Sequence, residues 1–497
     1  MRLIASRPSY RGTAVFGLTS LVLGVASIAA HAQVSKNCQL LAEVKPSTSP
    51  QFNDVWGYVD PATGRECAIL GGTAATYIVE TTNPTAPVVR GTFTQSSSGW
   101  STSIWSDMKA WKGYAYVVTE GGGGIKVLDL RDMSNPKYVT TWGTTLWSHA
   151  HNIAMDMERG IVVVHGTGGT RGESLRFIDV DTTPGSPALL ATWSGPYQHD
   201  LSLQHGLLHG SEIYAGRYAL YDISQSMTSP TLLGSVQTPR TFTHNTWPTY
   251  DDKYCVTTDE RSNGPMAIYD ISARSTPVYQ SQYHAGPSTS IIHNAYVLDY
   301  VAHMSHYTEG YRSVDMSDPK NPVEVAYYDS WSGSSSGYEG AWGCYCYQPS
   351  GIVYLSDITR GLLVLKPAST TIRYGKATAG TGGQEPHGFT LGSAFVGNAN
   401  FQLACRDAKP NAPVITVLSP ARANVSAGGL TFNVNLVGAI LLTSVTGTGG
   451  ETRIPLPIAN TPSLNNIQLA IQHFVVDGGG SVGFAATKGL ELTTFTR

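Results

Sequence analysis

Charged residues are scarce in this sequence. Asp, Glu, Lys and Arg together make up 13% of the 497 residues, and the formal net charge is -3. That balance provides no basic surface of the kind that binds nucleic acid. The chain instead contains 53 glycines, 26 tyrosines and 10 tryptophans. A chain with few charges, many glycines and many aromatic residues is typical of a turn-rich all-β protein.

Familiar catalytic motifs are also missing. The sequence contains no G-x-S-x-G nucleophile motif and no H-E-x-x-H zinc motif. The glycine-rich stretch Thr119–Ile125 lacks the lysine and the following helix of a phosphate-binding loop, so we interpret it as a hairpin turn. These searches therefore identify no local catalytic motif in the sequence.

One apolar run stands out, at the N-terminus. Ala14–Ala30 follows three arginines and ends at Ala30-His31-Ala32, the form of a signal-peptidase site. We expect residues 1–32 to be a cleaved signal peptide and the mature protein to be secreted, extracellular or at the cell surface, with the periplasm as the alternative location. A short membrane anchor is the other interpretation, but Gly and Ser interrupt the run.

After this segment no further membrane span is expected. Export permits disulfides among the six cysteines, although six cysteines allow 15 pairings and the sequence does not choose between them.

A repeat of about 45 to 50 residues organises the chain from about Asn53 to Pro367. Each copy has an apolar strand, an acidic residue and a turn that usually contains proline, as in K-V-L-D-L-R-D-M-S-N-P from Lys126. Seven copies with about four strand-like runs each predict a seven-bladed β-propeller. The last copy lacks one strand, and C-Q-L-L-A-E-V from Cys38 fits that place, so we expect an N-terminal strand to close the ring.

These repeats resemble the LVIVD-repeat proteins, in particular the secreted "choice-of-anchor B" group. The resemblance covers about Cys38 to Pro367 and depends on segments such as D-V-W-G-Y-V-D-P-A-T-G-R-E, A-H-N-I, F-T-H-N-T-W, I-I-H-N and S-D-I-T-R-G-L. It implies an exported repeat protein whose C-terminal anchoring module varies, and it implies no particular activity.

The composition changes after the repeats. We expect a propeller domain over residues 33–367, a linker over 368–383 and a small antiparallel β-sandwich over 384–497, because the last segment alternates apolar with small or polar residues and contains few charges. The last segment resembles a C-terminal module of secreted planctomycete-like proteins. It has no apolar tail, which argues against a membrane or glycolipid anchor.

Four histidines recur at equivalent places in the repeat, at the start of the expected innermost strand, and each precedes Asn or Asp. We align seven positions, Trp56, Asp107, His151, His199, His244, His293 and Trp342. Innermost strands line the axis of a propeller, so the four imidazoles and the Asp107 carboxylate are expected to converge. Because side chains alternate along a strand, the Asn or Asp after each histidine is expected to point into the blade. A second series is expected near the same mouth: Glu120, His165, Glu212, Glu260, His303 or His306, and Asp357.

This pattern supports three hypotheses. In the first, His151, His199, His244, His293 and Asp107 bind a divalent transition metal (Zn, Mn, Ni, Cu or Fe), and the protein acts on an extracellular polymer or glycan, as a metal-dependent hydrolase if it is an enzyme. In the second, the histidines are structural and the propeller is a non-catalytic platform that binds a cell-surface component. In the third, the protein is a metal-free polysaccharide lyase. The candidate catalytic residues are His199, His244, Tyr197, Arg261 and Glu260.

Overall fold

The computed structural model describes residues 34–167 and 173–497, and the expected signal peptide lies outside this range. The all-β fold predicted from the sequence is confirmed. No α-helix occurs in the two described segments, which contain three short 3-10 turns, η1 (Ser96–Ser98), η2 (Thr381–Gly383) and η3 (Pro462–Leu464). None of the helical turns in these segments has the length and apolar character needed to cross a membrane.

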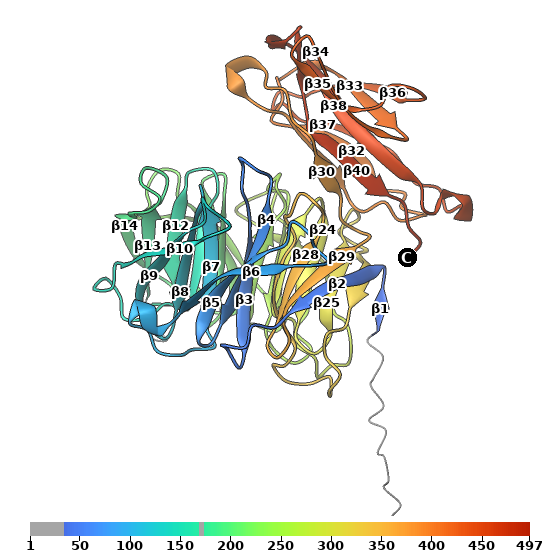
Figure 1. The fold of residues 1–497 in the computed structure, drawn as a ribbon. Coiled ribbons are helices and arrows are strands. Elements are labelled where there is room, and N and C mark those ends of the chain that lie inside the picture. The colour runs from blue at the N-terminus through green and yellow to red at the C-terminus, as the bar shows by residue number, and fades with distance from the viewer. Residues whose placement is uncertain (1–33, 168–172) are drawn as a thin grey trace, which may run out of the picture. The chain divides into compact units, whose positions relative to one another are not determined.

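Residues 34–367, apart from the short undescribed stretch, form one five-stranded and six four-stranded antiparallel sheets in a propeller-like fold (Figure 1). The first three sheets in chain order are β3–β6 (Phe52–Val59, Glu66–Gly72, Ala75–Glu80, Val88–Thr94), β7–β10 (Ser106–Trp111, Tyr114–Thr119, Gly122–Asp129, Lys137–Trp142) and β11–β14 (Asn152–Asp156, Ile161–His165, Glu173–Asp179, Ala188–Gly195). The next two are β15–β18 (Leu201–Gln204, Leu207–Glu212, Arg217–Asp222, Thr231–Gln237) and β19–β22 (Thr243–Pro248, Tyr254–Asp259, Met266–Asp270, Val278–Tyr283).

The last two sheets of this region each contain an N-terminal strand. β23–β26 (Asn294–Leu298, Val301–His306, Gly310–Asp315, Val323–Tyr328) include β1 (Ser35–Lys36), and β27–β29 (Ala341–Tyr345, Val353–Asp357, Gly361–Pro367) include β2 (Cys38–Val44). β2 pairs with β29 from Cys38 opposite Pro367 to Val44 opposite Leu362. The first strand of each sheet contacts the first strand of the next, and β27 contacts β3.

One local rule repeats from sheet to sheet. The acidic residue that ends the third strand accepts a hydrogen bond from the backbone N–H two residues further on, which starts the tight turn. This contact occurs at Asp129, Asp179, Asp222, Asp270 and Asp315, with distances of 2.8 to 3.0 Å. The acidic residue of the sequence repeat is therefore a turn residue.

The C-terminal residues form three further groups of strands. The largest sheet has the order β30, β40, β38, β33, β36 (Ile372–Tyr374, Gly489–Thr493, Gln468–Ser481, Pro413–Ser419, Ile440–Val445), and β39 (Phe484–Ala486) pairs with β38. The others are β31, β32, β37 (His387–Leu391, Gln402–Arg406, Thr452–Pro455) and β34, β35 (Arg422–Ala427, Leu430–Val434).

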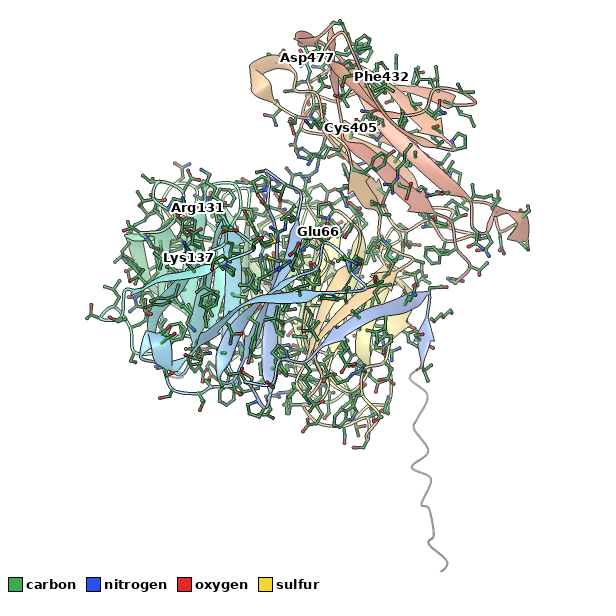
Figure 2. All side chains as sticks on the ribbon, viewed as in Figure 1. Glu66, Arg131, Lys137, Cys405, Phe432 and Asp477 are labelled. Carbon is green, nitrogen blue, oxygen red and sulfur yellow. The ribbon has the colours of Figure 1, made fainter. Side chains whose placement is uncertain are left out.

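Buried side chains connect these C-terminal sheets. Leu403 of β32 belongs to the same hydrophobic cluster as Leu418 of β33 and Ile471 of β38. The ring of Phe432 of β35, which Figure 2 labels, lies on the C-terminal strands. Its centroid is 5.3 Å from that of Phe474 of β38. β30 lies inside the segment expected to be a linker and pairs with β40.

The disulfides that export permits are not formed. All six cysteines are free and buried, among them Cys405, which Figure 2 labels. Five of them lie on strands (β2, β4, β20, β27 and β32), no two of which are hydrogen-bonded neighbours, and Cys346 follows β27 closely.

Candidate functional site

The four repeated histidines lie where strand pairing is irregular or has not yet begun. His244 is skipped in the pairing of β19 with β20, because Thr243 faces Asp259 and Asn245 faces Thr258. This β-bulge interrupts the alternation of side chains. His151 and His293 immediately precede the first residues of β11 and β23. His199 is separated from the first residue of β15 by one residue. The rule that successive side chains point to opposite faces of a strand therefore does not hold at these positions. It cannot be used to place the Asn or Asp that follows each histidine in the blade interior.

The structure brings the four imidazoles together in one continuous row, although they come from four different sheets. The ring centroids of His151 and His199 are 4.4 Å apart, those of His199 and His244 are 4.3 Å apart, and those of His244 and His293 are 4.6 Å apart. Trp342 continues the row at 5.1 Å from His293. We call His151, His199, His244 and His293 the histidine row.

Both ends of the histidine row are anchored through Nδ1. His151 Nδ1 lies 2.6 Å from Oε1 of Glu120, and His293 Nδ1 donates a hydrogen bond to the backbone carbonyl of Trp342. A carbonyl only accepts, so the proton of neutral His293 is on Nδ1 and its Nε2 presents a lone pair. Such outer partners orient the imidazoles of metal sites.

Glu260 contacts the middle of the row. Its Oε2 lies 3.4 Å from His244 Nε2, and its Oε1 lies 3.9 Å from His293 Nε2. The buried phenol of Tyr307 donates a hydrogen bond of 2.7 Å to Oε1. This buried hydrogen bond holds the carboxylate against the imidazoles.

Three of these residues have the spacing of a metal centre. His199, His244 and Glu260 each offer one ligand atom, and these atoms lie within 4.8 Å of one another. Ligands at about 2.0–2.2 Å from one ion are separated by up to about 4.4 Å, so small side-chain rotations bring this set into range. The Nδ1 atoms of His199 and His244 are buried and have no hydrogen-bond partner.

Burial also sets the charge of these imidazoles. It lowers the pKa of His244 and His293 to about 3 and holds the pKa of His199 well below its usual range, with neighbouring histidines acting in the same direction on His199 and His293. Three histidines of the row are therefore neutral at pH 7, the form that binds metal. The hydrogen bond from His151 lowers the pKa of Glu120, which keeps this carboxylate charged.

Asp107 does not join the histidine row. Its carboxylate contacts Lys109 Nζ at 2.6 Å, and its Oδ1 accepts the N–H of Met108. Asn152 and Asp200 make the same contact with the residue that follows each of them, so Asp107 is equivalent to Asn152 rather than to His151. The alignment that placed Asp107 among the imidazoles was therefore wrong by one residue.

Asp107 belongs to a second layer of residues that follow the row positions. Asn245 Nδ2 donates to Asp200 Oδ2 at 2.7 Å, and the N–H of Ile153 lies 3.4 Å from Asp107 Oδ2. These contacts join the first strands of neighbouring sheets. Burial raises the pKa of Asp200 to about 6.

Trp56, aligned with the histidines in the sequence, lies elsewhere as well. Its ring contacts Tyr345 at 4.9 Å and Tyr296 at 6.2 Å, and Lys109 Nζ lies 4.5 Å from it. All four residues occupy equivalent places in their strands: Trp56, Tyr345, Tyr296 and Lys109 stand two positions after Asp54, Gly343, Asn294 and Asp107, respectively. Trp56 is therefore part of an aromatic layer and not of the histidine row.

The other candidates lie beside the row or away from it. The Tyr197 ring is 6.3 Å from His199, and the exposed Arg261 stacks over Phe242 at 4.1 Å. Of the second series, Glu120 and Glu260 contact the row, whereas Glu212 binds Arg217 and Tyr221. His303 donates to or accepts from Tyr311 inside its own sheet, which is a structural contact.

The comparisons with known proteins add no family. A scan against protein-family models found no match, and a search of the curated proteins found no similar sequence.

The buried histidines predict that acid destabilises the fold. Burial lowers the histidine pKa to about 3 at His165, His244, His293 and His303, and to about 4 at His209 and His473. Because the unfolded chain takes up these protons below about pH 6.5 and the folded chain does not, the free energy of unfolding falls as the pH falls from 6.5 toward these values.

Each such group contributes up to about 1.4 kcal/mol per pH unit in that window. Urea unfolding at pH 7, 6 and 5 measures the effect, and His303→Gln is expected to reduce the pH slope by about one proton. Equal stability at pH 7 and pH 5 would contradict the assignment of these histidines as buried and neutral.

Proposed function

We propose that the histidine row with Glu260 is a binding site for a divalent transition metal. The observation that carries this proposal is the set of ligand atoms of His199, His244 and Glu260 within 4.8 Å of one another. Neutral imidazoles with a carboxylate suit Zn²⁺, Mn²⁺, Ni²⁺, Cu²⁺ or Fe²⁺, whereas calcium prefers oxygen ligands throughout. His293, whose Nε2 faces Glu260, and His151 at the other end are the further candidate ligands.

We propose that the sheets β3–β29 are the blades of a seven-bladed LVIVD-type β-propeller, closed by β2 on β29 and followed by a C-terminal β-sandwich. The contact of β27 with β3 and the pairing of β2 with β29 support closure. Residues from different sheets then meet at one axis, which is why the histidines converge.

We further propose that the protein is exported and acts on an extracellular polymer, glycan or cell-surface component. A bound divalent ion would provide Lewis acidity and lower the pKa of a bound water. The chain's own residues would hold the imidazole orientations through Glu120 and the Trp342 carbonyl, and the position of Glu260 through Tyr307. A metal-dependent hydrolase is the enzyme class that this arrangement favours.

Metal titration tests the proposal directly. The purified chain, dialysed against a chelator and then titrated with Zn²⁺, Mn²⁺, Ni²⁺, Cu²⁺ or Fe²⁺ under anaerobic conditions, is expected to bind about one ion per chain. Isothermal titration calorimetry and elemental analysis measure affinity and stoichiometry. Failure of all five ions to bind above the level of an unrelated protein would refute the metal site.

Tyr307→Phe is expected to weaken metal binding by about tenfold, within the 10–100-fold range typical of outer-shell substitutions. The substitution removes the hydrogen bond to Glu260 and keeps the ring that packs 5.0 Å from His293. Tyr338→Phe is the matched control, because Tyr338 is exposed and contacts the Tyr307 ring. Equal affinities for the two variants would show that Glu260 does not depend on Tyr307.

A further inference from the structure

A large cavity lies toward the ends of the first strands, away from the histidine row. Its volume is about 630 Å³, and the first strands of all seven sheets of residues 34–367 contribute to its walls. In β11, for example, His151 of the row precedes the strand, whereas Ala154 and Met155 line the cavity. The volume is in the range of about 300–1,000 Å³ that is usual for ligand sites.

Two small side chains leave room for this cavity. The aromatic layer takes one residue from the first strand of each sheet, and in five sheets that residue is large: Trp56, Lys109, Trp247, Tyr296 and Tyr345. In the neighbouring strands β11 and β15 the same place, two positions after Asn152 and Asp200, is occupied by Ala154 and Ser202. Both small residues line the cavity. The layer is therefore incomplete on this side, where a bound molecule can enter it.

The walls of the cavity are aromatic and apolar. The ring centroid of Tyr347, which follows β27, is 6.4 Å from that of Trp56 and 6.1 Å from that of Trp247, and all three rings line the cavity. Met155 of β11 and Leu201 of β15 also line it. Because aromatic rings pack well against the faces and edges of other rings, these walls favour a ligand with flat apolar rings.

The buried walls provide no unpaired charge. Among the described residues that line the cavity, Lys109 is the only charged one that is buried. Its Nζ is 2.6 Å from the Asp107 carboxylate and 4.5 Å from the centroid of the Trp56 ring. A charged ligand would lose its hydration here without meeting an opposite charge, so the cavity favours a neutral ligand.

Several hydrogen-bonding groups of the walls have no partner. Trp56 and Tyr345 are only 6% and 8% exposed, and neither the indole N–H nor the phenol hydroxyl forms a hydrogen bond with a described residue. The hydroxyl of Ser202 is also buried without a partner among the described residues. Because buried donors without an acceptor are destabilising, these groups favour a ligand that carries acceptor oxygens.

We infer that this cavity binds a neutral, mainly apolar ring compound that carries carbonyl or ether oxygens. Its rings lie against Trp56, Trp247 and Tyr347, and its oxygens accept hydrogen bonds from Trp56 and Tyr345. A saccharide fits these walls less well, because most of its hydroxyls would lose their hydration without gaining a partner. This binding site is separate from the histidine row and does not require a metal.

Coumarin tests the class of ligand, because it is a neutral, flat ring compound with a carbonyl and a ring oxygen. Titration of the purified full chain, followed by ligand-observed NMR, is expected to give a Kd of about 1 mM or below, as is usual for a compound of this size. Coumarin-3-carboxylate adds a negative charge to the same rings and is expected to bind at least about tenfold more weakly, and cellobiose more weakly still. Failure of coumarin to bind, or equal or tighter binding of either comparison compound, would overturn the inference.

Filling the cavity tests where the ligand binds. Ser202→Tyr gives β15 the residue type that the aromatic layer has in β23 and β27, and it is expected to weaken coumarin binding by at least about tenfold. Ser272→Tyr, at an exposed position of the turn after β21, is the matched control and is expected to bind coumarin like the wild type.

A second filling variant covers the case in which Ser202→Tyr does not fold. Ala154→Leu adds less volume at the neighbouring small position and is also expected to weaken coumarin binding. Wild-type affinity for coumarin in a folded filling variant would overturn the inference. Metal binding is expected to stay unchanged in all of these variants, which separates this site from the proposed metal site.

Discussion

Replacement of His199 and His244 together by alanine is expected to abolish specific metal binding, with a loss of affinity of more than about 100-fold. These residues provide two of the three ligand atoms that lie within 4.8 Å of one another, and their removal leaves Glu260 with no imidazole of that set. Calorimetric titration of the variant and of the wild type with the best-bound ion measures the loss.

The control must separate ligand loss from loss of structure. His209 is also buried, but its Nδ1 bonds the hydroxyl of Tyr218 outside the row, so His209→Ala is expected to reduce stability and to keep metal affinity. If the alanine double variant does not fold, the His199→Asn, His244→Asn pair preserves more of the side-chain volume and serves instead. Unchanged affinity in a folded double variant would exclude these histidines as ligands.

Deletion of β2 is expected to have the largest effect on stability. A chain that begins at Lys45 loses the fourth strand of the sheet β27–β29, and the backbone and apolar side chains of β29 become exposed. The free energy of unfolding is expected to fall by at least about 3 kcal/mol, because several buried side chains and a complete strand pairing are lost. Urea unfolding followed by tryptophan fluorescence measures this change.

Two comparisons make the deletion informative. A chain that begins at Ser35 retains both N-terminal strands and is expected to match the stability of the longer protein. A synthetic peptide of residues 35–46 is expected to bind the deleted chain and to restore part of its stability. If the chain that begins at Lys45 is as stable as the one that begins at Ser35, β2 does not close the fold.

Local patterns in the sequence predicted much of the fold. The repeated acidic residue and turn gave the period, and the pairing of Cys38–Val44 with β29 agrees with the strand that the last repeat lacks. These features are local, or depend on counting strands, so periodicity is sufficient to find them.

The sequence did not show which residues of the first strands lie level with the histidine row. The bulge at His244 and the early positions of the other histidines break the two-residue alternation, so Asp107 and Trp56 were aligned with the wrong layer. A bulge adds one residue without a reliable sequence signal, and an error of one residue moves a side chain to another layer.

The hydrogen bonds that orient the histidines and Glu260 also could not be predicted from the sequence. Glu120 and Glu260 belonged to the expected second series, but their bonds to His151 and to Tyr307 join residues that are 31 and 47 positions apart. His293 donates its hydrogen bond to the backbone carbonyl of Trp342. Every residue has such a carbonyl, so the residue type at this position does not indicate the contact. Such contacts follow from the way that neighbouring sheets pack.

X-ray absorption at the metal edge tests the central claim most directly, because it reports the ligands of the bound ion. The metal-loaded chain is expected to show nitrogen and oxygen ligands at about 2.0–2.2 Å, with the outer-shell scattering of at least two imidazoles. His199→Asn, His244→Asn is expected to remove the contribution of these two imidazoles to that scattering. A first shell of sulfur at about 2.3 Å, or of oxygen alone, would contradict a metal centre built on the histidine row.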